Sequence, residues 1–314
     1  MWAVRYIFFI FCLLSFVESH GQISNVYNEL RNLNFKITTT DTILGWRRDG
    51  NLRLNFGQTH YENWVQNNNS RLDLNVQLNQ RIYYQYRKNL WDNQVYLQYG
   101  LSKLYGEGLQ KSLDRLEVNS IYGKIINPHL SYSYFANFRT QFSNSYDYKR
   151  DEKKDYRISG FMSPSFLTTG AGIMWRRNNN LYINLAPVTW RLVSIISPVY
   201  KYNNQEKKFI NSDETEVFGI PAGNSSIHHL GFNASLYYKL ELFKKRWSIE
   251  NRLALYSNYL SNPKNFDVDY TFNTRYKINK FVSTNFTIQA VYDDDVFAGF
   301  QIRENFSIGL NLNI

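Results

Sequence analysis

The sequence has little of what would define several common fold classes. Its 314 residues include one cysteine, Cys12, and only six prolines. A single cysteine excludes a disulfide scaffold and a cysteine-based zinc site. Only one long apolar run occurs, so a bundle of membrane-spanning helices, each needing about 20 apolar residues, is also excluded.

Aromatic residues, in contrast, are abundant. The chain has 25 tyrosines and 22 phenylalanines, a net charge of +10 and a mean hydropathy of -0.47. Intrinsic disorder is excluded because 43% of the residues are hydrophobic and 17% aromatic. An aromatic-rich chain that is hydrophilic on average is typical of strands that alternate between an apolar and a polar face.

The first residues have the three parts of a secretory signal peptide. A basic start, Met1–Arg5, precedes the apolar run Tyr6–Val17, and the small residues Ser19 and Gly21 mark a cleavage site. We expect residues 1–21 to be removed, which leaves a mature chain without cysteine. The alternative is that this run is a buried element of the mature fold.

The rest of the chain alternates apolar and polar residues with a period of two. From Arg71 to Tyr86, leucine, valine, isoleucine and tyrosine fill the even positions almost completely. This period is that of a β-strand with one apolar face. Similar stretches lie at 51–57, 91–101, 113–126, 130–142, 156–175, 181–194, 230–242, 247–255, 266–276, 282–292 and 300–314. The sequence predicts an all-β fold, an antiparallel transmembrane β-barrel of about 12 strands with a range of about 10–14.

Strand and loop lengths favour a membrane barrel over a soluble β-sandwich. The alternation lasts longer than the five or six residues usual for soluble strands and matches the roughly 9–11 residues that cross a bilayer. Long connections are predicted at 58–70, 104–112, 143–155, 197–228, 258–265 and 293–298, and short ones at 87–89, 127–128, 176–180, 243–246 and 277–280. Their alternation is that of an outer-membrane barrel with outward long loops. We therefore predict a periplasmic lead-in over 22–48 and a barrel over 49–314.

Charged residues of both signs share the face opposite the apolar stripes. These candidate lumen-lining residues are Arg53, Arg71, Asp73, Arg115, Glu117, Arg139, Arg157, Lys239, Glu241, Glu250, Arg252, Asp267, Asp269, Arg275 and Arg303. Eight-stranded barrels are filled by side chains and sixteen-stranded porins hold water, so twelve strands leave two interpretations. The charges form either a salt-bridged structural plug or the lining of a narrow pore.

Other polar motifs give no catalytic, metal or cofactor site. His129 and Ser131 have the spacing of an outer-membrane phospholipase, but their parity places them inside the barrel rather than on the lipid face. His228 and His229 are adjacent and should point to opposite faces, which disfavours a metal site. Asp293, Asp294 and Asp295 lack the spaced ligands of a calcium loop. We expect a protein that is not an enzyme.

Basic residues gather in the predicted short turns, for example Arg87, Arg176 and Lys244. There they can meet anionic headgroups, so the expected partners are outer-membrane lipid and lipopolysaccharide, with a small solute if the lumen conducts. Nucleic acid is not expected as a partner in this compartment.

Several short motifs resemble a known family. They are Gly45-Trp46-Arg47-Arg48, Leu54-Asn55-Phe56-Gly57-Gln58, Glu62-Asn63-Trp64, Phe138-Arg139-Thr140-Gln141-Phe142, Phe161-Met162-Ser163-Pro164, Leu185-Ala186-Pro187-Val188-Thr189 and the tail from Tyr292 to Leu310. They are similar to the domain-of-unknown-function family numbered 3078. The resemblance implies an exported, all-β protein of the Gram-negative outer membrane with no established activity. Asn67, Asn68 and Asn69 stand where that family often has a Gly-Gly pair.

Three functions are compatible with these patterns. The first is a narrow pore or small-solute transport protein, and the second is a non-conducting structural or surface-interaction barrel that acts through the 197–228 loop. The third is an outer-membrane hydrolase that would depend on Ser131. We rank them in this order.

Overall fold

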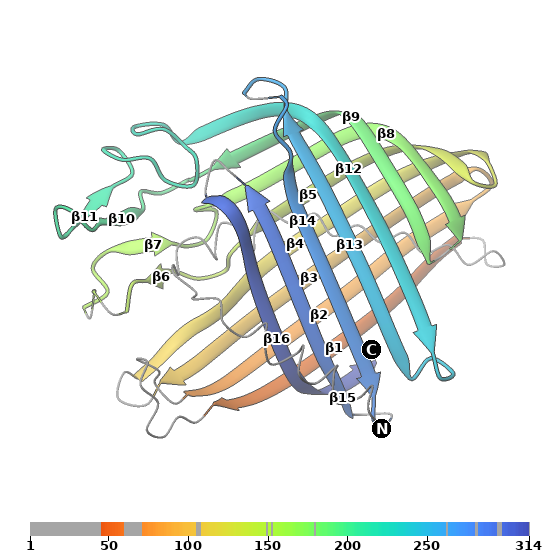
Figure 1. The fold of residues 1–314 in the computed structure, drawn as a ribbon, viewed down its shortest axis with the longest axis horizontal. Coiled ribbons are helices and arrows are strands. Elements are labelled where there is room, and N and C mark those ends of the chain that lie inside the picture. Colours follow the sequence, from red (N-terminus) through yellow and green to blue (C-terminus); the bar gives the residue numbers. More distant parts are fainter. Residues whose placement is uncertain are drawn as a thin grey trace.

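The computed structural model describes residues 45–59, 71–104, 108–148, 150–151, 153–178, 180–261, 263–279, 282–293 and 297–313. Twelve strands within these ranges close into an antiparallel barrel (Figure 1), which confirms the predicted fold class. They are β1 (Gly45–Thr59), β2 (Arg71–Tyr86), β3 (Asn89–Leu104), β4 (Gly108–Asn127), β5 (Leu130–Thr140), β8 (Ser165–Asn178), β9 (Leu181–Ser194), β12 (Ser226–Leu242), β13 (Trp247–Asn258), β14 (Asp267–Lys277), β15 (Val282–Asp293) and β16 (Phe297–Asn313). The predicted signal peptide lies outside the described residues.

Each strand pairs with its neighbour along the chain, and β1 pairs with β16 to close the barrel. One end carries the two-residue to four-residue turns, such as Arg87-Lys88 between β2 and β3, and we call it the turn end. The opposite end, which we call the loop end, carries the long connections of residues 141–164 and 195–225. Within the loop-end connections lie two small sheets, β6 (Ser145–Tyr146) with β7 (Arg157–Ser159), and β10 (Tyr200–Asn203) with β11 (Lys208–Asn211).

The two-residue period of the sequence corresponds to the outer and inner faces of the barrel wall. Leu74, Val76 and Ile82 of β2 are exposed on the outer surface, whereas the polar residues between them point inward and are half-buried. The same division holds around the barrel, because successive side chains of a strand point to opposite sides. The outer surface is therefore apolar, as contact with lipid requires.

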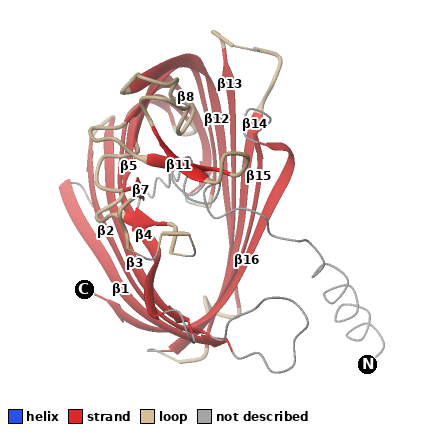
Figure 2. Cartoon of the chain, turned by 90° about the vertical axis from the view of Figure 1, so that its left-hand side faces the viewer, coloured by secondary structure: helices blue, strands red, loops and turns tan. Residues whose placement is uncertain are grey.

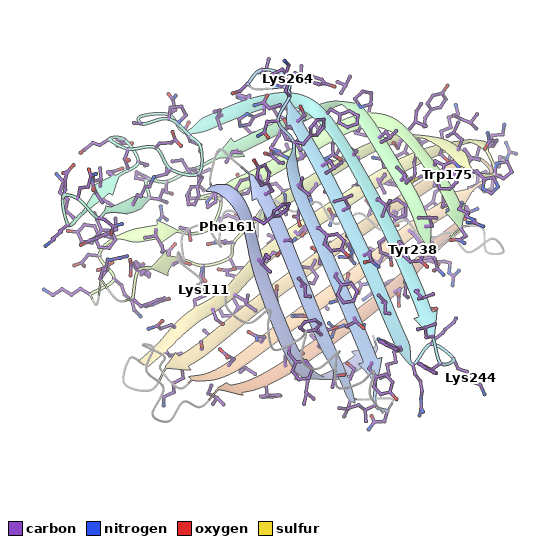
Figure 3. The ribbon with its side chains drawn as sticks, viewed as in Figure 1. Lys111, Phe161, Trp175, Tyr238, Lys244 and Lys264 are labelled. Carbon is purple, nitrogen blue, oxygen red and sulfur yellow. The ribbon has the colours of Figure 1, made fainter. Side chains whose placement is uncertain are left out.

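Aromatic side chains ring the outer surface near the turn end. Trp46 on β1 lies 5.0 Å from Tyr84 on β2 and 5.8 Å from Trp91 on β3, measured between ring centroids. Figure 3 shows Trp175 on β8 and Tyr238 on β12 toward the same end, with Lys244 in the adjacent turn. Such a girdle is typical of the level at which a barrel meets the lipid headgroups. Tyr182, at the turn-end start of β9, is an exception, because its ring points inward and is buried.

A bulge interrupts the wall where Pro187 lies in β9. Proline has no N–H to donate, and the pairing of β9 with β8 and with β12 skips at this point. Gly172 and Gly231 lie at the two skips, on β8 and β12. A Cβ atom at Gly172 would come within 2.0 Å of the Leu185 carbonyl oxygen, so the backbones approach too closely for a side chain there.

Three predicted boundaries were wrong. The barrel begins at Gly45 rather than at residue 49, because Arg48 and Gly50 interrupt the apolar stripe of β1. β4 begins at Gly108 rather than at 113, because an extra residue opposite Gly100 shifts its parity. The strand predicted over 156–175 begins at Ser165, because Pro164 cannot donate to a ladder.

No helix among the described residues is long and apolar enough to span a membrane.

The outer surface gives a direct test of the membrane-facing wall. Leu97 lies in the middle of β3 on the apolar face, and Gln98 follows it on the inner face. We expect Leu97→Arg to lower the free energy of unfolding from lipid vesicles by about 2–4 kcal/mol. Gln98→Arg, the matched control, should cost less than half as much in the same urea titration. Equal losses would contradict the assignment of the two faces.

Candidate functional site: the charged interior of the barrel

The inner face divides into two sides that differ in exposure. The inward residues of β5 and β9 are all buried and those of β4, β8 and β12 mostly so, although Lys239 and Glu241 on β12 are half-buried; we call this the packed side. The inward residues of β1, β2, β3, β13 and β14 are mostly half-buried, and we call this the accessible side. Water can therefore contact side chains on one side of the lumen along much of its length.

The packed side contains an apolar cluster in its turn-end half. Phe135, Met174, Tyr182 and Tyr237 each have at most 1% of their surface exposed, and Ile121 and Ala186 complete the cluster. The rings of Tyr182 and Tyr237 stack with their centroids 5.3 Å apart. Aromatic and aliphatic residues at inward positions exclude water from this part of the lumen.

Glu117 on β4 is the centre of a buried polar network next to this cluster. Its carboxylate accepts hydrogen bonds from Asn119 Nδ2 at 2.8 Å and Asn137 Nδ2 at 3.0 Å. Arg115 also donates to it and forms an ion pair. Arg139 lies opposite Glu117 in the β4–β5 ladder and is 1% exposed. Arg139 Nε and Nη1 have no hydrogen-bond partner among the described groups.

Most other inward charges are paired at close range. Arg81 Nε donates to Asp92 at 2.8 Å, and a second nitrogen of Arg81 also contacts this carboxylate. Lys239 Nζ lies 2.5 Å from Glu241 and 4.0 Å from Glu250, which also accepts from Arg252 at 3.1 Å. Each of these charges has an opposite charge nearby. The pairing offsets part of the free-energy cost of placing charged groups in a confined lumen.

One ion pair joins strands that are not adjacent in the barrel. Arg191 on β9 lies 3.9 Å from Asp267 on β14, and its guanidinium carbon lies 3.6 Å from the ring centroid of Tyr256 on β13. A small cavity lies here, lined by Arg191, Asn233, Tyr256, Asp267 and Asp269 among others. The contact lies near the loop end and joins β9 of the packed side to β14 of the accessible side.

The loop end is covered by ordered polypeptide. Val199, Val217 and Ile220 of the 195–225 connection pack against Phe166 and Val193, which are inward residues at the ends of β8 and β9. Viewed from this end in Figure 2, β7 and β11 lie in front of the barrel opening.

Two of the loop-end connections are also joined to each other. Tyr156 stacks on Phe209 with ring centroids 4.6 Å apart and meets Tyr200 edge-on at 5.3 Å. Arg157 Nη2 donates to the Pro198 carbonyl at 2.8 Å. We call residues 141–164 and 195–225 together the loop cap.

The structure places most predicted lumen residues on inward positions of barrel strands. These are Arg53, Asp73, Arg115, Glu117, Arg139, Lys239, Glu241, Glu250, Arg252, Asp267, Asp269 and Arg275. The side chains of Arg71 and Arg303 lie outside the described part of the structure. Arg157 was placed wrongly: it belongs to β7 in the loop cap, because the barrel strand starts only after Pro164.

Sequence reasoning missed several inward residues that shape the lumen. Arg81, Asp92 and Arg191 have the correct parity, so this signal could have found them. Tyr182 and Tyr237 could not be found by polarity, because an aromatic residue is equally compatible with a lipid-facing girdle.

The other motifs do not assemble into a site. Ser131 points inward and is buried, whereas His129 is exposed at a turn with Nδ1 3.0 Å from the Arg176 carbonyl oxygen. His228 stacks on Trp190 on the outer face, and His229 pairs with Asn258 Nδ2 at 2.9 Å on the inner face. Over the described ranges, no three His, Cys, Asp or Glu side chains are grouped to hold a metal ion. Asp294 and Asp295 lie outside those ranges.

Twelve closed strands with an apolar exterior and a charged interior define a transmembrane β-barrel. The model of the family described as "Protein of unknown function (DUF3078)" matches residues 56–146. This match confirms, over that segment, the resemblance predicted from the sequence. A comparison with curated proteins gives no match.

Solved barrels show a distant likeness. The translocator domain of the autotransporter NalP from Neisseria meningitidis is 7% identical, with a TM-score of 0.36, and the alignment covers 92% of each chain. A NanC porin is 7% identical with a TM-score of 0.36, covering 84% of this chain and 97% of the porin. A TodX monoaromatic hydrocarbon channel has the same identity and TM-score, covering 87% and 90%. Likeness at this level carries no argument about function.

The polar network around Glu117 gives a stability prediction. Glu117→Gln leaves the buried Arg139 and the half-buried Arg115 without their nearest carboxylate, so we expect the free energy of unfolding to fall by about 3–5 kcal/mol. The matched control is Glu206→Gln, which removes the carboxylate of an exposed ion pair with Lys208 and should change stability little. Urea unfolding of both variants in detergent micelles measures the difference, and equal effects would contradict a structural role for Glu117.

Proposed function

We propose that the protein is an outer-membrane β-barrel that provides a narrow, water-filled passage for small polar solutes or ions. The observation that carries this proposal is that charged side chains on the inner face of the barrel are partly exposed to solvent. Arg252 is 32%, Glu241 27% and Glu250 19% exposed, although all three point into the barrel. In a lumen filled by side chains, as in eight-stranded barrels, such residues would be buried.

The passage is narrow for two reasons. The apolar cluster of the packed side occupies part of the cross-section. The loop cap restricts it near the loop end. A solute would therefore follow the accessible side past the inward residues of β2 and β13. The outward aromatic girdle and the apolar wall support a location in the outer membrane.

A planar-bilayer recording of the refolded protein tests this function. We expect discrete conductance steps. Gln77→Trp adds bulk to the accessible side, and we expect it to reduce the conductance to about half or less. Leu78→Trp adds the same bulk on the outer face and should leave the conductance unchanged. A correctly folded barrel without conductance steps would contradict the proposal, as would equal conductance in the two variants.

A second function, a surface-interaction barrel, is favoured by the order of the loop cap. Its aromatic contacts and the β10–β11 hairpin hold exposed polypeptide in a fixed shape, which suits recognition of a partner. This function predicts no conductance. It also predicts a discrete protein adduct when a photoreactive residue replaces Lys201 in β10, and loss of that adduct on Tyr156→Ala. We propose no catalytic role for His129 and Ser131.

A further inference from the structure

Asn233 on β12 is a buried amide without a hydrogen-bond partner. The residue is 1% exposed, and neither its Oδ1 nor its Nδ2 bonds any group in the described part of the chain. An unpaired amide in a buried position costs free energy, so nearly all buried polar groups in proteins are hydrogen-bonded. Asn233 lines the small cavity between β9, β12, β13, β14 and β15, which we call the Asn233 cavity. Its donor and its acceptor are therefore available to a molecule in that cavity.

The Asn233 cavity lies on the inner face of the barrel wall. Asn233, Tyr256 and Asp267 are direct cross-strand neighbours on β12, β13 and β14. Ala254, the next inward residue of β13, lies opposite Asp269, and its small side chain leaves space beside these residues. The cavity encloses about 340 Å³ of empty space, part of which is open to solvent. The Asp267 side chain is 17% exposed, so water reaches the cavity from the lumen.

Charged groups of both signs line the same cavity. Arg191 Nη1 lies 3.9 Å from Asp267 Oδ2, a separation longer than a hydrogen bond. The guanidinium carbon of Arg191 lies 3.6 Å from the ring centroid of Tyr256, so a cation–π contact holds the guanidinium in place. Asp269 Oδ1 accepts a hydrogen bond from Gln289 Nε2 at 3.3 Å. A guanidinium donates up to about five hydrogen bonds and a carboxylate accepts about four, so these groups can bind a further molecule in addition to their present contacts.

The presence of both signs decides which kind of ligand fits. A simple anion in the cavity would lie beside two carboxylates, and a simple cation would lie beside a guanidinium, so like charges would repel in either case. A zwitterion avoids this repulsion, because its carboxylate can accept from Arg191 while its ammonium donates to Asp267 and Asp269. Asn233 Nδ2 can donate to the same molecule, and Asn233 Oδ1 can accept from it.

We infer that the Asn233 cavity binds a small zwitterion, a molecule that carries one carboxylate and one ammonium group as an amino acid does. This inference rests on the proposed pore function and names a class of solute for it. The cavity lies near the loop end, where Arg191 of the packed side meets Asp267 of the accessible side. A solute that follows the accessible side therefore passes the cavity.

The first test is the binding of glycine, the smallest amino acid, to the refolded barrel in detergent micelles, measured by saturation-transfer NMR. Acetate and methylammonium are the matched ligands, because each carries one of the two charged groups of glycine. We expect glycine to bind about tenfold more tightly than either, since each alone loses a charged hydrogen-bonding group. Absence of glycine binding would overturn the inference, and so would an equal affinity for acetate or for methylammonium.

Asn233→Leu tests the amide, because leucine has nearly the shape of asparagine and forms no hydrogen bond through its side chain. We expect glycine binding to weaken about tenfold, while the free energy of unfolding without ligand stays the same or rises, because the amide loses no protein partner. The matched control is Ser235→Ala, which removes another unpartnered buried polar atom of β12 outside the cavity and should leave binding unchanged. Equal binding by wild type and Asn233→Leu, or a less stable Asn233→Leu barrel, would overturn the assignment of Asn233.

Asp269→Asn tests the charges independently of Asn233. Removal of one carboxylate should weaken the binding of glycine and methylammonium and strengthen that of acetate, since less negative charge then faces the ligand. Heat-modifiable gel migration verifies that each variant is folded. Unchanged affinities for all three ligands would overturn the zwitterion site.

A planar-bilayer recording separates the binding site from the pore. Glycine added at constant KCl should reduce the conductance of the wild type more than that of Asn233→Leu. If glycine binds in micelles but leaves the conductance of both unchanged, the assignment of zwitterions as the solute is overturned and the pore stands. If glycine binds to a barrel that shows no conductance steps, the pore is overturned and the binding site stands.

Discussion

A strand that crosses a bilayer has to satisfy its backbone hydrogen bonds within the sheet, because lipid offers no partner. Twelve antiparallel strands meet this requirement by closing on themselves. Closure has a second consequence that shapes the rest of the molecule. With apolar side chains directed to lipid, the two-residue period directs every second, polar side chain into one confined lumen. The number of side chains that point inward therefore follows from the number and length of the strands.

Charged groups that lie this close together in a confined lumen need opposite charges nearby. The packed side and the accessible side provide them in different ways. On the packed side, the Glu117 carboxylate accepts hydrogen bonds from Arg115 and two asparagines, beside an apolar cluster that excludes water. On the accessible side, Glu250 pairs with Arg252, and both also remain solvated, while Lys239 of the adjacent β12 lies 4.0 Å from Glu250. A twelve-stranded barrel is intermediate between the filled eight-stranded and the open sixteen-stranded kind. In this barrel, one side of the lumen is filled by buried side chains and the other side carries side chains that water can contact.

The period of the sequence predicted the wall well because one repeated constraint governs every strand. Arg53, Glu250 and Arg275 could be assigned to the lumen from parity alone. Where a local feature breaks the period, the prediction failed: the extra residue in β4 shifted its start, and Pro164 separated Arg157 from the barrel. Parity also cannot say which inward residues of non-adjacent strands meet. The contact between Arg191 and Asp267 depends on the tilt and stagger of strands that are not neighbours. The loop cap was beyond prediction too, because the stacking of Tyr156 on Phe209 joins two connections with no shared pattern.

The division of the lumen into a packed and an accessible side is the centre of this account, and the near absence of cysteine allows it to be measured directly. In a Cys12→Ser background, single cysteines at Gln77 on the accessible side and at Asn137 on the packed side would be treated with a water-soluble, thiol-specific reagent in the folded protein. We predict rapid modification at position 77 and slow modification at position 137, with equal rates for both after unfolding. Equal rates in the folded barrel would contradict the account.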